Sequence, residues 1–150
     1  LRIIGDGEER IKLLKQIDDL YLNNQVTIAP TSDDIWSEYL RFQYFVMPSN
    51  YEGTPNALLE AISSGMIPIV STGVGDLSGK IRKIEPRLVF PSGNEDKLRE
   101  VLDLAYLQTR FNFDTVRSKE QLIRPYQFEH SMPIWTNIVF GGSSHFRQVL

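Results

Sequence analysis

The sequence predicts an α/β fold: a Rossmann-like, doubly wound parallel sheet with helices on both faces. Short apolar runs alternate along the chain with segments whose apolar residues recur at helical spacing. Turns containing glycine or proline separate these segments, and strands that alternate with helices in this way form parallel sheets. The chain has 150 residues, 41% of them hydrophobic, which suffices for about one domain with its own core.

The first strand is expected over residues 1–4, followed by the turn Gly5-Asp6-Gly7 and a helix over residues 8–22. A strand that leads into Gly-x-Gly is also how dinucleotide-binding folds begin. Arg10, however, stands where the third glycine of that fingerprint belongs, and no second βαβ unit with a suitably placed acid follows. We therefore reject dinucleotide binding here and expect only a tight turn.

A second strand over residues 26–29 leads through a loop at Pro30 to a short helix over residues 35–41, with Ser32 or Asp33 as its cap. By the same rules this loop is an ordinary connection between a strand and a helix.

The third strand is expected over residues 44–47. It ends at Pro48, which lacks the N–H that a sheet ladder needs. In the helix that follows, Thr54 is the expected N-cap and Pro55 the first helical residue, and Gly65 suits the left-handed position that ends the helix.

The remaining elements are predicted from the same patterns. They are strands over residues 67–71 and 88–90, and helices that start at Glu95 and cover residues 114–124 and 135–139. We expect one domain over residues 1–140 and a flexible end, rich in glycine and serine, over residues 141–150.

The charge pattern excludes a nucleic-acid surface. The 16 basic and 19 acidic residues are well mixed and give a net charge of −3, whereas a nucleic-acid binder usually shows a basic stripe. Lys80 and Arg82 could reach a phosphate, but two basic residues on a helix are usually solvated, and we expect that here.

The absence of cysteine excludes disulfides and thiolate metal sites and is compatible with a cytoplasmic protein. The two histidines, His130 and His145, lie far in the sequence from any pair of acids, so we expect neither a metal site nor a cofactor. No apolar run approaches the roughly 18 residues that cross a bilayer, and we expect a soluble or peripheral protein.

The stretch between the third strand and its helix combines features that folding alone does not explain. The N–H groups of residues 54–57 would converge with the positive end of the helix dipole, as they do at sites that hold phosphates. Glu52 precedes this helix end, and Glu60 follows it by about one and a half turns. A carboxylate can accept two hydrogen bonds from a vicinal diol such as a ribose. The arrangement predicts binding of a nucleotide-sugar.

The same stretch carries a family resemblance. Glu52, seven residues and then Glu60 lie within Glu-Gly-Thr-Pro-Asn-Ala-Leu-Leu-Glu-Ala, followed by Ser-Ser-Gly-Met-Ile-Pro-Ile-Val. This resembles the donor-site motif of the group 1 family of retaining glycosyltransferases, which have the two-domain GT-B fold. The resemblance runs from Leu1 to about Ile138 and implies the C-terminal, donor-binding half of that fold.

The resemblance also implies roles for individual residues. Glu52 would lie beside the transferred sugar as the catalytic residue, and Glu60 would bind the ribose of the donor. Pro30 would lie near the base of the nucleotide. The other donor-binding residues that we predict are Gly53, Thr54, Pro55, Asn56, Ala57 and Leu58.

The implied reaction transfers a hexose from a nucleotide-diphosphate sugar, commonly a uridine or guanosine one, to a glycan, lipid or other acceptor, with retention of anomeric configuration. In the family, the acceptor is bound by an N-terminal domain, and a first strand followed by an Arg and a Lys precedes the position of Leu1. We therefore expect this chain to be an excerpt that is inactive alone, from a cytoplasmic protein that can associate with the inner face of the membrane.

The sequence is also compatible with two other classes of function. One is a non-catalytic nucleotide-binding module, in which Glu60 binds a ribose but no sugar is transferred. The other is a phosphorylase or a nucleotide-sugar epimerase of the same architecture.

Overall fold

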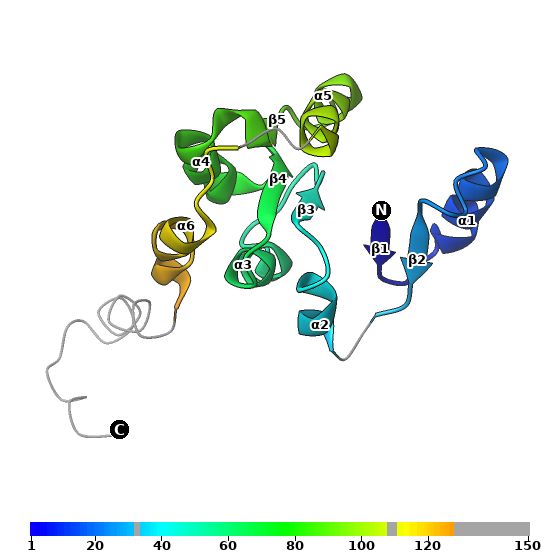
Figure 1. The fold of residues 1–150 in the computed structure, drawn as a ribbon, viewed down its shortest axis with the longest axis horizontal. Coiled ribbons are helices and arrows are strands. Elements are labelled where there is room, and N and C mark those ends of the chain that lie inside the picture. The colour runs from blue at the N-terminus through cyan, green and yellow to red at the C-terminus, as the bar shows by residue number, and fades with distance from the viewer. Residues whose placement is uncertain (32–33, 108–110, 128–150) are drawn as a thin grey trace, which may run out of the picture. The chain divides into compact units, whose positions relative to one another are not determined.

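The computed structural model describes residues 1–31, 34–107 and 111–127, and the chain divides into two compact units at the junction of Glu38 and Tyr39 (Figure 1). Several predictions lie outside the described residues: the cap at Ser32 or Asp33, the helix over residues 135–139, the two histidines and the end over residues 141–150. Within the described part of the chain, no helix combines the length and the apolar character that crossing a membrane requires.

The first unit contains two parallel strands, β1 (Arg2–Ile4) and β2 (Thr27–Ala29), joined by helix α1 (Arg10–Asp19). In the pairing, Arg2 lies opposite Thr27 and Ile4 lies opposite Ala29. The short helix α2 (Ile35–Tyr39) begins in this unit, where the side chain of Glu38 accepts a hydrogen bond from Arg2 at 2.8 Å.

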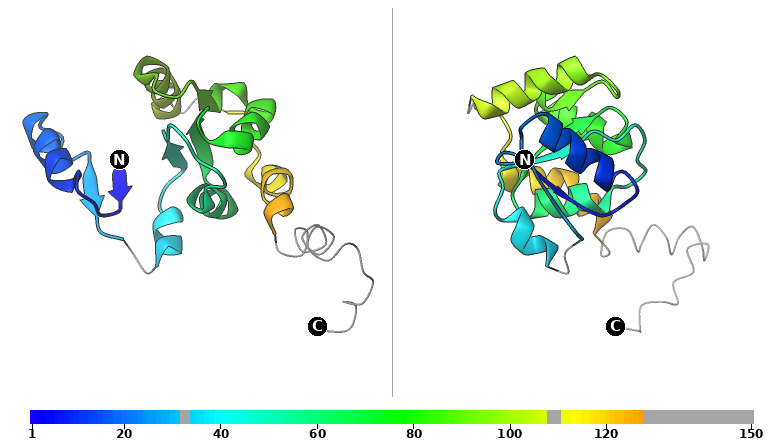
Figure 2. Two further views of the ribbon diagram at one scale, coloured as in Figure 1. Left: turned by 180° about the vertical axis from the view of Figure 1, so that it is seen from behind. Right: turned by 90° about the vertical axis from the view of Figure 1, so that its right-hand side faces the viewer.

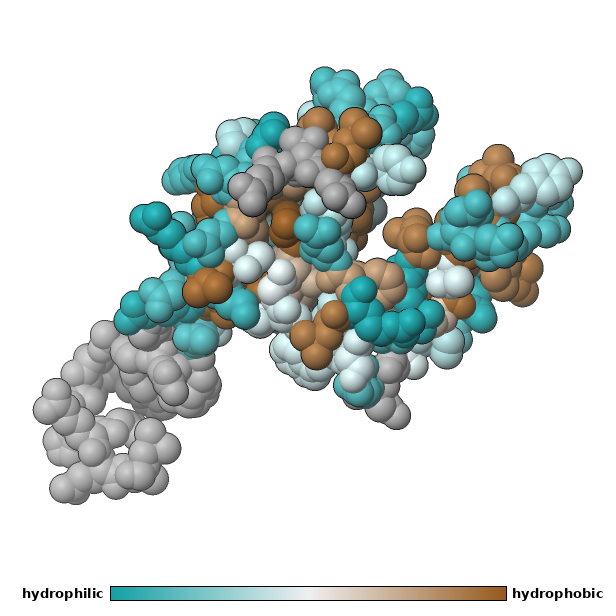
Figure 3. Space-filling view, in the orientation of Figure 1, coloured by the Kyte–Doolittle hydropathy of each residue, from teal (hydrophilic) through white to brown (hydrophobic). Residues whose placement is uncertain are grey.

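Helix α1 ends earlier than the predicted boundary at residue 22 because Tyr21 adopts the left-handed conformation, with φ of +55°. The N–H of Leu22 bonds back to the carbonyl of Ile17, and the N–H of Tyr21 bonds to the carbonyl of Asp18, both at 2.9 Å. Hydrophobic residues, drawn in brown, lie among hydrophilic ones on the surface of this unit (Figure 3), and Ile11 is 81% exposed.

The second unit is built on a three-stranded parallel sheet in the order β3 (Tyr44–Met47), β4 (Ile67–Ser71), β5 (Val89–Phe90). Helix α3 (Asn56–Ser63) connects β3 to β4, and α4 (Gly75–Ile84) with the 3₁₀ turn η1 (Pro86–Leu88) connects β4 to β5. The predicted α/β class and the parallel strands are confirmed.

Helices cover both faces of this sheet. Right-handed crossovers put α3 and α4 on the same face, and α6 (Thr115–Leu122) packs against both of them. Helix α5 (Glu95–Tyr106) packs against β5 on the other face, and the 3₁₀ turn η2 (Arg124–Tyr126) follows α6 (Figure 2).

The core of the second unit is continuous from the sheet to helices on both of its faces. Burying apolar surface is the main favourable term in folding, at about 25 cal/mol per Å². Residues that are fully or almost fully buried in this cluster are Leu58, Ile62, Ile69, Val70, Val74, Leu77, Ile81, Leu88, Phe90, Val101, Phe113 and Leu122.

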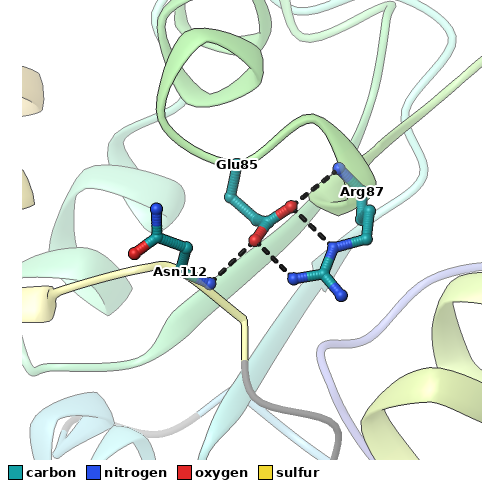
Figure 4. Close-up of polar contacts among 3 residues, drawn as sticks. All are labelled: Glu85, Arg87 and Asn112. Carbon is teal, nitrogen blue, oxygen red and sulfur yellow. Dashed lines mark hydrogen bonds and ion pairs between the residues drawn. The ribbon is translucent and has the colours of Figure 1, made fainter.

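Glu85 is a buried carboxylate in this unit, only 3% exposed. Its two oxygens accept hydrogen bonds from Nε and one terminal nitrogen of Arg87, at 2.9 and 2.7 Å, and from the backbone N–H of Asn112 at 2.7 Å (Figure 4). The guanidinium carbon of Arg87 also lies 5.2 Å from the ring centre of Phe111. One carboxylate therefore joins the end of α4 to the segment that leads into α6.

The prediction of a strand over residues 88–90 is too long by one residue. Residues Pro86–Leu88 form the turn η1, in which the N–H of Arg87 donates to the Glu85 side chain at 3.2 Å. Lys80 is less solvated than predicted, because its side chain is 32% exposed and its ammonium lies 2.7 Å from Asp76 and 5.0 Å above the ring of Tyr126. Arg82 is exposed, as predicted.

Candidate functional site

The loops after β3 and β4 are bonded to each other at the carboxyl ends of the strands, where ligands bind in parallel sheets. The hydroxyl of Ser71, the last residue of β4, donates to the carbonyl of Ser49 in the loop after β3. The N–H of Gly73 donates to the Ser71 hydroxyl at 3.1 Å. The N–H of Glu52 donates to the carbonyl of Gly73 at 2.8 Å. These bonds hold the backbone of Glu52 against the end of β4.

The two loops approach so closely that glycine is required between them. A Cβ atom on Gly73 would overlap the carbonyl oxygens of Ser49 and Asn50. Gly75 has φ of +51°, and a Cβ there would lie 3.0 Å from the carbonyl oxygen of Glu52. Side chains at these positions would push the loop after β3 away from the sheet.

The loop after β5 joins the same network. The N–H of Ser92 donates to the hydroxyl oxygen of Thr72 at 2.9 Å, and the hydroxyl of Ser92 donates to the amide oxygen of Asn50 at 2.9 Å. All three strands of this sheet thus contribute a loop to one hydrogen-bonded polar platform, which consists of residues 48–55, 72–74 and 91–94.

Glu52 lies on this platform as a half-buried carboxylate. Its Oε1 accepts a hydrogen bond from the hydroxyl of Ser49 at 3.0 Å. The backbone bond to Gly73 and the side-chain bond to Ser49 together fix both ends of the residue. A carboxylate held in this way keeps lone pairs for further donors, such as sugar hydroxyls.

Helix α3 begins one residue later than predicted. Pro55, not Thr54, occupies the N-cap position, with extended backbone angles of φ −76° and ψ 100°. No side chain caps this helix, because proline has no group to do so. The N–H of Leu58 donates to the carbonyl of Pro55 at 3.1 Å, which leaves the N–H groups of Asn56 and Ala57 in the first turn without intrahelical partners.

The predicted donor-binding residues differ in exposure. Gly53, Thr54 and Asn56 are exposed, and Ala57 is half-buried. Pro55 and Leu58 are buried, and the Leu58 side chain belongs to the hydrophobic core. Three of the residues around the start of α3 are therefore exposed to solvent.

Glu60 lies in the second turn of α3 and is half-buried. Its Oε2 accepts a hydrogen bond from the hydroxyl of Tyr39 at 3.2 Å. Tyr39 is 6% exposed, and its ring packs edge-to-face on Phe45 of β3 with a centroid distance of 6.0 Å. Burial and the negative charge of Glu60 raise the pKa of Tyr39 to about 12, so the phenol is protonated at neutral pH and donates.

The sequence did not single out Tyr39, because an aromatic residue on a short helix is expected to pack, and its hydroxyl shows no pattern that points to Glu60. Of the other predicted residues, Pro30 is exposed after β2 and belongs to the first compact unit, whereas residues 52–60 belong to the second.

Chemically, the site offers N–H groups and the positive end of a helix dipole for an anion, with a carboxylate before them and another after them. No group of three or more histidine, cysteine, aspartate or glutamate side chains that could hold a metal ion occurs among the described residues. The helix start and the two carboxylates are groups that can bind phosphates and hydroxyls.

The family model described as "Glycosyl transferases group 1" matches residues 1–118, well over half of the chain and the whole of the candidate site. The chain belongs to the group 1 glycosyl transferases. The resemblance inferred from the motif of two glutamates is confirmed at the level of the family.

Relatives of this group 1 glycosyl transferase chain include proteins named for polysaccharide biosynthesis. It is 32% identical over 73 residues to the Vi polysaccharide biosynthesis protein VipC/TviE of Salmonella typhi, covering 49% of this chain and 12% of that protein. It is 39% identical over 72 residues to the lipopolysaccharide core biosynthesis glycosyltransferase LpsE of Rhizobium meliloti, covering 48% of this chain and 21% of that protein. The chain therefore spans only a small part of these relatives.

Among solved structures, the crystal structure of TarM matches with a TM-score of 0.77 and 22% sequence identity. The match covers 91% of this chain and 28% of the TarM chain. The match confirms the predicted α/β fold. That it covers only part of TarM agrees with the prediction that this chain forms one half of a GT-B fold.

Proposed function

We propose that this group 1 glycosyl transferase chain forms the donor-binding part of a retaining enzyme that transfers a hexose from a nucleotide-diphosphate sugar. The observation that carries the proposal is the placement of two fixed carboxylates around an uncapped helix start. Glu52 is held by Ser49 and Gly73, Glu60 is held by Tyr39, and the first turn of α3 lies between them in the sequence.

In this proposal the diphosphate of the donor accepts hydrogen bonds from the amides at the start of α3, from Gly53 to Ala57. The carboxylate of Glu60 accepts hydrogen bonds from the two ribose hydroxyls, and Glu52 accepts from hydroxyls of the transferred sugar. Rigid loops support such a function, because a fixed donor geometry lowers the entropic part of the barrier.

The helix dipole alone is a weak contribution, at roughly 0.3–1 kcal/mol for an exposed helix end. Further positive charge must therefore stabilise the departing diphosphate. The matched region is only 12% and 21% of two relatives. We propose that this charge and the acceptor-binding surface belong to segments of the intact protein other than this chain. The acceptor would be a glycan or a lipid-linked glycan, and neither a metal nor a cofactor is expected to take part.

Substitution of the two glutamates in the intact protein tests these roles. Glu60→Gln removes the charged acceptor of the ribose hydroxyls, and we expect donor affinity to fall at least about 10-fold, because each hydrogen bond to a charged group contributes about 1.5–3 kcal/mol. Glu52→Gln is expected to lower turnover by about 100-fold and to weaken donor binding by no more than about 10-fold, because the contacts of Glu52 to the sugar hydroxyls are proposed to strengthen in the transition state.

Isothermal titration calorimetry with nucleotide sugars and a sugar-transfer assay measure the two effects, and proton NMR of the product reports the anomeric configuration. Glu120→Gln, an exposed glutamate of α6, is the matched control and should change neither quantity. Unchanged binding and turnover in both site variants would disprove the assigned roles. Binding without any transfer would instead identify a non-catalytic module, and formation of a sugar phosphate or an epimerised sugar would identify one of the other two enzyme classes.

A further inference from the structure

Tyr39 is a buried polar residue beside the candidate site, and its role in the proposed function has not been assigned. It is the last residue of α2 and is almost fully buried, yet its hydroxyl reaches the first two turns of α3. The hydroxyl oxygen lies 3.2 Å from Oε2 of Glu60 and 3.4 Å from the carbonyl oxygen of Ala57. The hydroxyl therefore lies beside the helix start that the donor is proposed to occupy.

The position of this hydroxyl is determined by packing and not by the helix that it touches. The Tyr39 ring stands edge-on to Phe45 of β3, at an interplanar angle of 76°. A buried ring with such a neighbour has little rotational freedom, so its hydroxyl is a fixed point against which a flexible side chain can be oriented. Glu60, by contrast, has three side-chain torsions, and it is only half-buried.

The phenol has one proton, and Oε2 of Glu60 and the carbonyl oxygen of Ala57 are both possible acceptors for it. The carboxylate of Glu60 is the closer acceptor and carries a charge, which makes it the stronger one. Because the pKa of Tyr39 is raised to about 12, the proton is present throughout the physiological range and the hydroxyl acts as a donor.

We propose that Tyr39 is a positioning residue for donor recognition: its hydroxyl holds Oε2 of Glu60 so that the carboxylate presents its remaining lone pairs to the two hydroxyls of the donor ribose. This inference rests on the proposed function, since it assumes that Glu60 binds the ribose. A carboxylate offers about four acceptor sites, so one bond from Tyr39 leaves enough for a diol. The benefit is preorganisation, because the rotational entropy of Glu60 is lost before the donor arrives.

Tyr39→Phe in the intact protein is the direct test, because it removes the hydroxyl and keeps the ring on Phe45. The probes are the four common ribonucleoside diphosphates and their 2′,3′-dideoxy counterparts, with affinities measured by calorimetry. We expect Tyr39→Phe to weaken binding of the preferred ribonucleotide by about 10-fold, the factor that corresponds to about 1.4 kcal/mol. Binding of the dideoxy counterpart should stay unchanged, because Glu60 then has no diol to bind.

Tyr44→Phe is the matched control. Tyr44 starts β3, at the end of the strand opposite to the site, and its ring stands edge-on to Phe111 at 6.1 Å. This variant should bind both nucleotides as the wild type does. Glu60→Gln and the double variant Tyr39→Phe/Glu60→Gln complete a cycle, in which the two single effects should be strongly non-additive, because Tyr39 acts through Glu60.

A purely structural role of Tyr39 would give a different result. It would lower the unfolding temperature and weaken ribonucleotide and dideoxynucleotide binding by the same factor, and this outcome would overturn the inference. A second measurement avoids the variant: in ¹³C-tyrosine NMR of the wild type, ribonucleotide addition should shift the Tyr39 ring signal and leave the Tyr44 signal in place. An unchanged Tyr39 signal would also overturn the inference.

The same measurements separate failure of this inference from failure of the proposed function. If Glu60→Gln removes the preference for ribonucleotides over dideoxynucleotides and Tyr39→Phe keeps it, only the role of Tyr39 is wrong. If Glu60→Gln has no effect on that preference, or the wild type binds none of the four ribonucleotides, the proposed function and the role of Tyr39 are both wrong.

Discussion

Gly73 is the residue at which two loops of the polar platform meet. Its N–H binds the hydroxyl of Ser71, its carbonyl binds the N–H of Glu52, and its missing side chain leaves room for the backbone of Ser49 and Asn50. The position of Glu52 is therefore set by a residue more than twenty positions further along the chain. Its contribution to the site is geometric, because it has no side chain to offer a ligand.

Gly73→Ala should damage both the fold and the site. The added methyl group would overlap two carbonyl oxygens, and relief of an overpacked contact usually costs about 1–3 kcal/mol in unfolding free energy. The loop that carries Glu52 would move, so turnover should also fall. Urea unfolding followed by circular dichroism measures the first effect, and the sugar-transfer assay measures the second.

Gly79→Ala is the matched control for this substitution. Gly79 lies within α4, and a Cβ there meets no atom within 4 Å. Alanine is the better helix former by about 1 kcal/mol, so this variant should be slightly more stable and equally active. A Gly73→Ala protein as stable and active as Gly79→Ala would show that the two loops are not tightly packed in solution.

At the scale of elements, the Glu85 carboxylate is a buried polar connection between α4 and the segment that leads into α6. It accepts two hydrogen bonds from the Arg87 guanidinium and one from the backbone N–H of Asn112. The hydrogen bonds from Arg87 hold the pKa of Glu85 at about 2, well below its ordinary value of 4.5. Folding therefore favours the ionised form of this side chain.

This shift predicts the pH dependence of stability. A carboxylate whose pKa is lowered by folding stabilises the folded state fully above the unfolded-state value of about 4.5, and the stabilisation is lost as the pH falls toward about 2. Glu85→Gln should thus lower the unfolding free energy by about 2 kcal/mol at pH 7, as expected for hydrogen bonds to a charged group. At pH 2 the variant and the wild type should be nearly equal.

Glu100→Gln is the control, because Glu100 forms an exposed ion pair with Lys97 at 2.7 Å, and such pairs contribute about 0–1 kcal/mol. Chemical denaturation at several pH values between 2 and 7 measures both variants. A Glu85→Gln effect that is equally large at pH 2 and pH 7 would contradict the ionic origin of the stabilisation.

At the scale of the whole molecule, the bounds of strands and helices could be predicted where a single residue, such as a proline or a glycine, determines where the element ends. Strands β3 and β4 have their predicted bounds, because Pro48 ends the first apolar run and Gly65 precedes the second. The end of α3 was also predicted, since Gly65 has φ of +92° and its N–H bonds to the carbonyl of Ile62. Family membership followed from the spacing of two glutamates.

Features that depend on contacts between distant segments could not be predicted. The bond from Tyr39 to Glu60 joins residues 21 positions apart, and the bond from Asn112 to Glu85 joins residues 27 apart. Lys80 was expected to be solvated because its own helix offers little reason for burial, whereas Tyr126, from another element, contacts its ammonium. The roles assigned to Glu52, Glu60 and the residues between them remain predictions.

The two compact units differ in how much core they contain, and this predicts a difference in local stability. Among the described residues of the first unit, Ile17 is the only hydrophobic side chain that is almost fully buried, whereas Leu58, Ala61 and Ile62 of α3 alone have no exposed surface. Backbone amides exchange with solvent through local opening, whose free energy rises with the apolar surface buried.

Hydrogen exchange measured by mass spectrometry at pH 7 should therefore be about 100-fold slower in α3 than in α1, a difference of about 2.8 kcal/mol. Equal protection of these two helices would mean that α1 buries its exposed Ile11 and Leu14 in solution, and the first unit would then be as stable as the second.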